Sequence, residues 1–207
     1  MEQALSLQEA WGPLVTLILA SIVVMGSPGP STMSVTAVGA AFGLRRSLPY
    51  LSGAILGTTV VLFAVAVGVV SILLSVPWLA PGLLALSTVY IAYLAFRIAT
   101  APPLGKNENA AAPSFAGGFL LAVANPKAYL AIAAVFAGTT LATESRIFEA
   151  VLKSVVLALM IVIIHVCWLL AGTSLSRMLR NPTSSRIVNL LFAAILIATT
   201  VMAVARG

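Results

Sequence analysis

Long apolar runs separated by short polar connections constrain this chain more than any other feature. Six such runs can be marked, each close to or above the about 20 residues that a helix needs to cross the hydrocarbon of a bilayer. A soluble domain could not bury so many apolar side chains, because 61% of the 207 residues are hydrophobic and only 8% are charged. We therefore predict an all-α membrane protein of about six transmembrane helices. The runs cover residues 12–42, 49–75, 78–98, 114–141, 150–176 and 187–205.

The basic charge balance fits a membrane protein better than a nucleic-acid-binding one. The net charge is +6, but the basic residues lie in short connections beside apolar runs, and no polar stretch interleaves them with aromatic residues. The single cysteine, Cys167, allows no internal disulfide and no cysteine-based metal site. No Lys or Arg precedes Arg45, so the first run lacks the basic start of a signal peptide and is expected to stay in the mature protein. We expect the lipid bilayer as a partner, and no nucleic acid, metal or cofactor.

Two of the six runs are interrupted near their middle by proline. Proline removes a backbone donor and clashes with the preceding helical turn, so each of these runs is expected to form two half-helices joined by unwound backbone. In the first run we predict half-helices over about 13–26 and 31–42. The interrupting motifs are Pro28-Gly29-Pro30 in the first run and Asn125-Pro126-Lys127 in the fourth.

The two interruptions suggest an internal repeat. Pro28 and Pro126 are 98 residues apart, close to half the chain. Three spans per half is an odd number, so the second half would be inverted relative to the first. Interrupted helices at corresponding positions of inverted halves are typical of the binding site of a secondary transporter. We predict one domain over 1–207, with half-repeats over about 1–98 and 114–207 and a linker over 99–113.

The interrupted runs also contain the residues best suited to bind a solute. Exposed peptide groups are costly in hydrocarbon, so the two breaks are expected to face each other or a shared cavity. Lys127 lies about 20 Å into its run, and no Asp or Glu lies inside any span. A ligand, or backbone carbonyls freed by the breaks, would therefore be its partner, unless it is neutral. The half-helix that starts at Ser31 would suit a carboxylate. The predicted substrate-binding residues are Pro28, Gly29, Pro30, Ser31, Thr32, Asn125, Pro126 and Lys127.

His165 is the candidate for proton coupling. It lies in the middle of the fifth run and shares a helical face with Ser154 and Gly172, so it is expected to face the interior of the bundle. Histidine titrates near neutral pH, which suits a proton carrier or a substrate contact. A buried histidine satisfied by its neighbours is the alternative.

Gly53 and Gly57 form a pair of small residues one turn apart in the second run. Such a pair lets two helix backbones approach closely. We expect it to serve packing, within the chain or between subunits.

Three motifs together resemble the lysine-exporter/homoserine–threonine-resistance (LysE/RhtB) family of small bacterial amino-acid exporters. They are Pro28-Gly29-Pro30, the Gly43-Leu44-Arg45-Arg46 run that follows, and Asn125-Pro126-Lys127, and the resemblance extends over essentially the whole chain. It implies a multi-pass exporter in the bacterial inner membrane, driven by a proton or ion gradient and compatible with homo-oligomers. It also places the first and third motifs at the functional centre. Family members often carry an acidic residue after Pro-Gly-Pro, where this chain has Ser31, and this change favours a neutral amino acid over lysine or arginine.

We therefore predict a secondary transporter that exports small, neutral amino-acid-like solutes by alternating access. An enzyme is disfavoured, because the sequence has no paired carboxylates, histidine cluster or Gly-x-Ser-x-Gly elbow. The single cysteine also disfavours electron transfer through a pair of intramembrane thiols. The alternative is a small channel or an accessory membrane subunit without its own transport activity, which hydropathy does not separate from a transporter.

Overall fold

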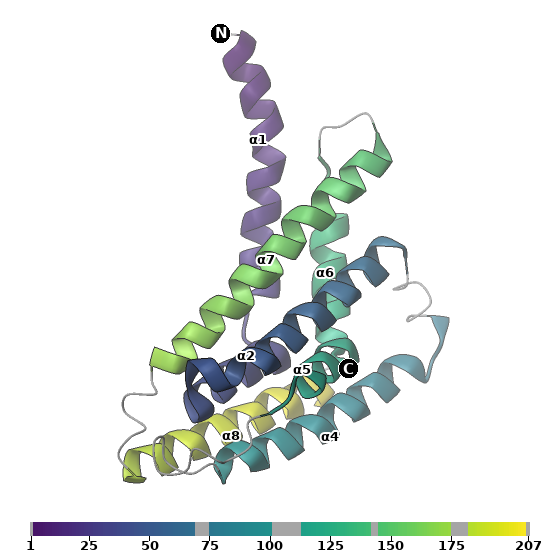
Figure 1. Ribbon diagram of the computed structural model, residues 1–207. Helices are drawn as coiled ribbons and strands as arrows, with labels where there is room; N and C mark the ends of the chain where they lie inside the picture. Colours follow the sequence, from purple (N-terminus) through teal and green to yellow (C-terminus); the bar gives the residue numbers. More distant parts are fainter. Residues whose placement is uncertain (1, 69–74, 101–112, 142–144, 175–181, 206–207) are drawn as a thin grey trace.

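The computed structural model describes residues 2–68, 75–100, 113–141, 145–174 and 182–205, and over those residues all regular structure is helical (Figure 1). This confirms the all-α fold class. The predicted linker over 99–113 falls almost wholly outside the described residues. The helices are α1 (Glu2–Ala20), its π-helical continuation η1 (Ser21–Met25), α2 (Pro30–Ala66), α4 (Leu79–Ala99), α5 (Phe115–Ala124), α6 (Pro126–Gly138), α7 (Arg146–Ser174) and α8 (Pro182–Ala205).

Length and composition qualify several of these helices as membrane spans. Within the described residues, α2, α7 and the Pro81–Ala99 part of α4 are each long and apolar enough to cross a bilayer. The helices α5 and α6 pass the same test as one broken span, bent by 62°. Shorter apolar helices cover Trp11–Met25 and Arg186–Ala198. The chain is therefore an all-α, multi-pass membrane protein, while the arrangement of six spans in two inverted repeats stays a prediction.

Both predicted interruptions are present. The first lies at 26–29, between η1 and α2, and the second is the single residue Asn125 between α5 and α6. Pro30 and Pro126 are the first residues of their helices, where a missing N–H group leaves no helical hydrogen bond unmade. The helix before the first break begins earlier than its apolar run, at Glu2, because hydropathy does not detect the polar start of a helix.

The helix α2 folds back on itself at Gly43, with no loop between the first and second predicted spans. Gly43 has φ 73°, in the left-handed region that glycine adopts without a steric penalty. The Ser47 hydroxyl donates to the carbonyl of Val38 at 3.1 Å, and the Tyr50 hydroxyl donates to Ser34 Oγ at 3.0 Å. Residues 16 positions apart would be separated by about 24 Å along a straight helix. The two arms of α2 are therefore antiparallel neighbours.

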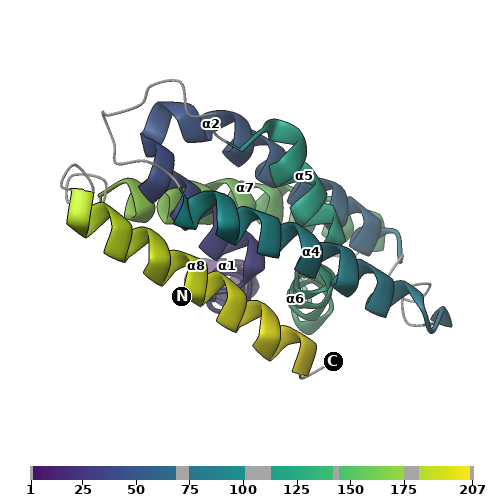
Figure 2. The ribbon, with the colours of Figure 1, turned by 90° about the horizontal axis from the view of Figure 1, so that it is seen from below.

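The two arms of α2 form the centre of the bundle, and α4 and α8 lie side by side against them (Figures 1 and 2). The first arm packs on α7 and the second on α5. A Cβ atom on Gly57 would come within 2.7 Å of the Phe119 carbonyl oxygen, and one on Gly53 would overlap the Phe115 carbonyl. The predicted pair of small residues thus serves packing within the chain.

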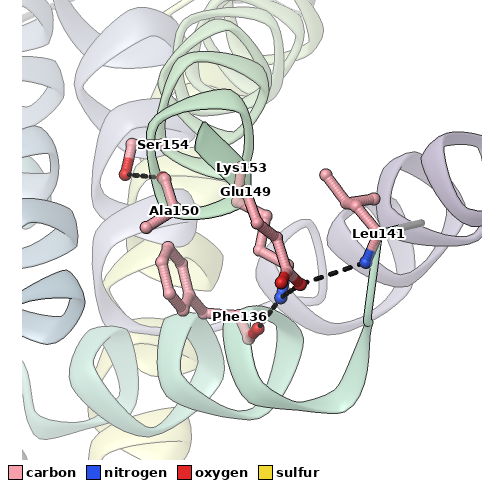
Figure 3. Close-up of polar contacts among 6 residues, drawn as sticks. All are labelled: Phe136, Leu141, Glu149, Ala150, Lys153 and Ser154. Atoms are coloured by element: carbon pink, nitrogen blue, oxygen red, sulfur yellow. Dashed lines mark hydrogen bonds and ion pairs between the residues drawn. The ribbon is translucent and has the colours of Figure 1, made fainter. Parts of the chain in front are cut away.

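An ion pair within the start of α7 bonds to the backbone at the end of α6 (Figure 3). Lys153 is buried, and its Nζ lies 2.7 Å from Glu149 Oε1 and donates to the Phe136 carbonyl at 3.0 Å. The same carboxylate oxygen accepts the N–H of Leu141 at 3.0 Å. Phe136 is in the last turn of α6, where a carbonyl has no partner within the helix. Lys153 and Glu149 therefore satisfy two backbone groups near the end of α6, the Phe136 carbonyl in its last turn and the Leu141 N–H just after it.

Glu149→Ala is expected to lower the melting temperature, because it leaves the buried Lys153 ammonium without a counter-ion. Adding Lys153→Met should then restore part of the loss, since an apolar chain of similar length fills the same space without a charge. Thermal unfolding of the purified single and double variants in detergent tests this. A double variant less stable than Glu149→Ala alone would contradict the view that the unpaired charge is the main cost.

Candidate functional site

Lys127 joins the two helix breaks. It lies in the first turn of α6, and its Nζ donates to the Ser27 carbonyl at 3.0 Å, to Ser27 Oγ at 2.8 Å and to the Pro28 carbonyl at 2.8 Å. An ammonium group has three donors, so all of them are engaged. The sequence left a ligand or freed backbone carbonyls as possible partners of Lys127, and in the structure its partners include the carbonyls freed by the first break.

Asn125 makes a second link between the breaks. Its side-chain carbonyl accepts the N–H of Lys127 at 3.2 Å and so caps the start of α6. Its amide nitrogen donates to Ser31 Oγ at 2.9 Å, in the first turn of α2. The start of α6 is therefore held to the start of α2 by one residue.

The unwound segment before α2 is held by Thr32 and fits closely against Lys127. The Gly29 N–H donates to Thr32 Oγ1 at 2.9 Å, which caps α2 from within its own first turn. A Cβ atom on Gly29 would come within 2.6 Å of Lys127 Nζ. Glycine therefore leaves room for the close approach of the lysine to the backbone, and a Cβ atom here would make the end of the Lys127 side chain shift.

Trp168 on α7 completes the first break, and the sequence analysis did not single it out. Its Nε1 donates to the carbonyl of Gly26 at 3.1 Å, and its own carbonyl accepts the Thr36 hydroxyl at 3.1 Å. A signal was present, because Trp168 lies three residues after His165 in the same span and so shares its side of the helix. Trp168 and Lys127 together satisfy three carbonyls that the break exposes.

A cavity of about 50 Å³ lies where the two breaks meet. Most of the predicted binding residues line it, whereas the three prolines Pro28, Pro30 and Pro126 shape the breaks without lining it. Ile132, Ile161 and Ile164 form part of an apolar wall. The complete lining is Met25, Ser27, Gly29, Ser31, Thr32, Thr58, Asn125, Lys127, Ala128, Ala131, Ile132, Ile161, Ile164 and His165.

The electrostatics of this cavity suit a zwitterion. The helices α2 and α6 both begin at the cavity beside Lys127, and the N-terminus of a helix carries positive partial charge. None of the lining residues is acidic. The unwound segment after η1 adds backbone carbonyls, which attract a cation and are bonded here by Lys127 and Trp168. No group of His, Cys, Asp and Glu within the described part of the chain could hold a metal ion.

His165 faces this cavity from α7 and is only 4% exposed. Its Nδ1 lies 2.8 Å from the carbonyl of Ile161, one turn earlier in the helix, while its Nε2 has no hydrogen-bond partner. A carbonyl can only accept, so Nδ1 carries the proton in this arrangement and Nε2 presents a lone pair. The prediction that His165 faces the interior is confirmed by its burial.

The comparison with known families decides the class of this protein. Residues 22–207 match the family model described as LysE type translocator. The chain belongs to the LysE type translocator family. Among its relatives is the "Cysteine/O-acetylserine efflux protein" of Salmonella choleraesuis (strain SC-B67), 29% identical over 83% of this chain and 87% of the relative. The protein of the same name from Escherichia coli (strain K12) is 29% identical over 86% of this chain and 90% of the relative. No solved structure matches the chain.

Membership of the LysE type translocator family confirms the resemblance seen in the sequence. The chain is a multi-pass transporter of the inner membrane and not an enzyme. The family model begins at residue 22, just before the first break, and so includes both breaks and the cavity between them.

Proposed function

We propose that this LysE type translocator exports small, neutral amino acids, with O-acetylserine and cysteine as the first candidates. The observation that supports the proposal most is the meeting of two helix N-termini and Lys127 at a cavity whose lining has no acidic residue. The relatives are named for efflux of two amino acids with short, uncharged side chains. A cationic side chain would find no carboxylate among the lining residues.

Each part of the proposed site has a role in holding a zwitterion. The substrate carboxylate binds at the start of α2, next to Ser31 and Thr32, and takes over one of the hydrogen bonds that Lys127 now makes to backbone carbonyls. Asn125 keeps the starts of α2 and α6 together while this exchange takes place. The apolar wall that includes Ile132 and Ile161 receives the side chain, and it favours small uncharged groups because charge is costly there.

We propose alternating access as the transport mechanism. A cavity of about 50 Å³ has room for a few ordered waters, so an amino acid enters only when the bundle opens. The two breaks, of which the second bends the chain by 62° between α5 and α6, provide hinges for such an opening. A proton gradient drives the cycle, and His165 is the proposed proton-coupling residue.

Transport by the purified chain tests the proposed function. Proteoliposomes are loaded with radiolabelled O-acetylserine, serine or lysine, and release is followed with and without an imposed proton gradient. We expect release of the neutral amino acids to be at least about tenfold faster than from protein-free liposomes, and lysine release to remain at that background.

The same assay separates the alternatives. Release that follows only the substrate's own gradient, with no response to the proton gradient, would indicate a channel. Release of lysine in preference to serine would overturn the proposed substrate class. A chain that releases none of the three alone, yet does so with a second membrane protein, would be an accessory subunit.

A further inference from the structure

The unpartnered Nε2 of His165 is the least satisfied polar atom of the cavity. A buried acceptor without a partner costs about 1–3 kcal/mol, so it is rarely left so unless something binds there. The ring cannot turn its other nitrogen into the cavity without breaking the bond to Ile161. The lone pair is therefore fixed in place and ready to accept one hydrogen.

We infer that the substrate's ammonium group and the coupling proton compete for Nε2 of His165, and that this competition couples export to proton entry. The inference rests on the proposed function and assigns an atom to its coupling step. One lone pair accepts an N–H from the substrate or binds a proton, and cannot do both.

The charges in the cavity reinforce this exclusion. Either occupant adds one positive charge at the same place, a substrate ammonium or an imidazolium. Lys127, from α6, is the other charged side chain of the lining, and the lining residues from η1, α2, the two breaks and the rest of α7 are uncharged. Two added positive charges beside Lys127, with no acidic residue to balance them, would repel each other strongly at low dielectric.

The cycle that follows is balanced in protons and substrate. When the cavity is open to the outside, a proton binds Nε2 and the N–H···Nε2 bond to the substrate breaks, so the substrate leaves. When it is open to the cytoplasm, the imidazolium gives its proton to water and the next substrate donates an N–H to the freed lone pair. One proton enters for each amino acid exported.

His165→Gln tests this directly, because glutamine keeps an acceptor near the position of Nε2 but does not bind a proton at physiological pH. We expect substrate binding to become independent of pH between about 5.5 and 8, downhill release to continue, and proton-driven uphill export to be lost. The wild-type dissociation constant for the substrate should rise about tenfold for each unit by which the pH is lowered, once the imidazolium form dominates. His165→Leu, which has no acceptor, should bind the substrate at least about fivefold more weakly than His165→Gln.

Cys167→Ser, at an exposed position two residues along the same helix, is the matched control and should keep proton-driven export.

The sequence contains one histidine, so nitrogen NMR of ¹⁵N-histidine-labelled protein reports on His165 alone. At a pH near the midpoint of the His165 titration, adding O-acetylserine should convert the imidazolium to the neutral ring. An Nε2 signal that ignores the substrate, or a His165→Gln variant that still exports uphill with pH-dependent affinity, would overturn the inference. Wild-type protein that releases no amino acid would instead count against the proposed function.

Discussion

Replacing Lys127 by methionine is expected to reduce amino-acid export by at least about tenfold. The substitution removes three hydrogen bonds, which leaves the Pro28 carbonyl without its donor and the Ser27 carbonyl with only the Thr32 hydroxyl at 3.4 Å. A hydrogen bond to a charged group contributes about 1.5–3 kcal/mol, and about 1.4 kcal/mol corresponds to a factor of ten in binding. The variant also lacks the cation proposed to receive the substrate carboxylate. Binding and the link between the two breaks are therefore lost together.

The measurement is release of O-acetylserine from proteoliposomes, beside a matched variant of Lys153, a buried lysine outside the cavity lining. Lys153→Met alters the tie between α6 and α7 away from the cavity lining, so it should retain export at a temperature where it stays folded. Lys127→Arg keeps the charge but places a larger, planar group against Gly29, and it should recover only part of the rate. Export by Lys127→Met at the wild-type rate would remove Lys127 from the proposed mechanism.

The positions of the two breaks could be predicted from sequence, because proline acts locally. Pro30 and Pro126 each begin a helix, because a proline lacks the N–H group that a preceding helical turn would bond. The turn at Gly43 lies in the predicted gap between the first two runs, over 43–48, but its form could not be predicted. A single glycine with positive φ reverses the chain there without a polar loop, so a hydropathy pattern records only a gap between two apolar runs.

The partners of the site residues could not be predicted, because they come from distant parts of the chain. Lys127 and Ser27 are 100 residues apart, and Trp168 and Gly26 are 142 apart. Sequence reasoning showed that Lys127 needed a partner and left a ligand and freed carbonyls as choices. The free lone pair of His165 depends on the Ile161 carbonyl one turn away, and its exposure to the cavity depends on how α7 packs on α2 and α6.

Gly118→Ala is expected to lower the free energy of unfolding by about 1–3 kcal/mol, the usual range for an overpacked interior. Gly118 lies on α5 against the second arm of α2. An added Cβ would overlap the carbonyl oxygen of Tyr50 and come within 2.9 Å of the backbone nitrogen of Ala54. Both obstacles are backbone atoms, so the helices must separate, and no side-chain rotation relieves the contact.

The effect of Gly118→Ala should reach the site as well as the melting temperature. The Tyr50 hydroxyl bonds Ser34, whose own hydroxyl donates to the Ser31 carbonyl at 2.8 Å, at the start of α2 where Asn125 is attached. Thermal unfolding in detergent should show a drop of several degrees, and export at permissive temperature should fall as well. Gly82→Ala on α4 is the matched control, because the nearest atom to its new Cβ is a Trp78 ring carbon at 3.9 Å, and helix propensity alone should leave it neutral or slightly more stable. Equal melting temperatures for the two variants would mean that α5 and α2 are not packed backbone to backbone.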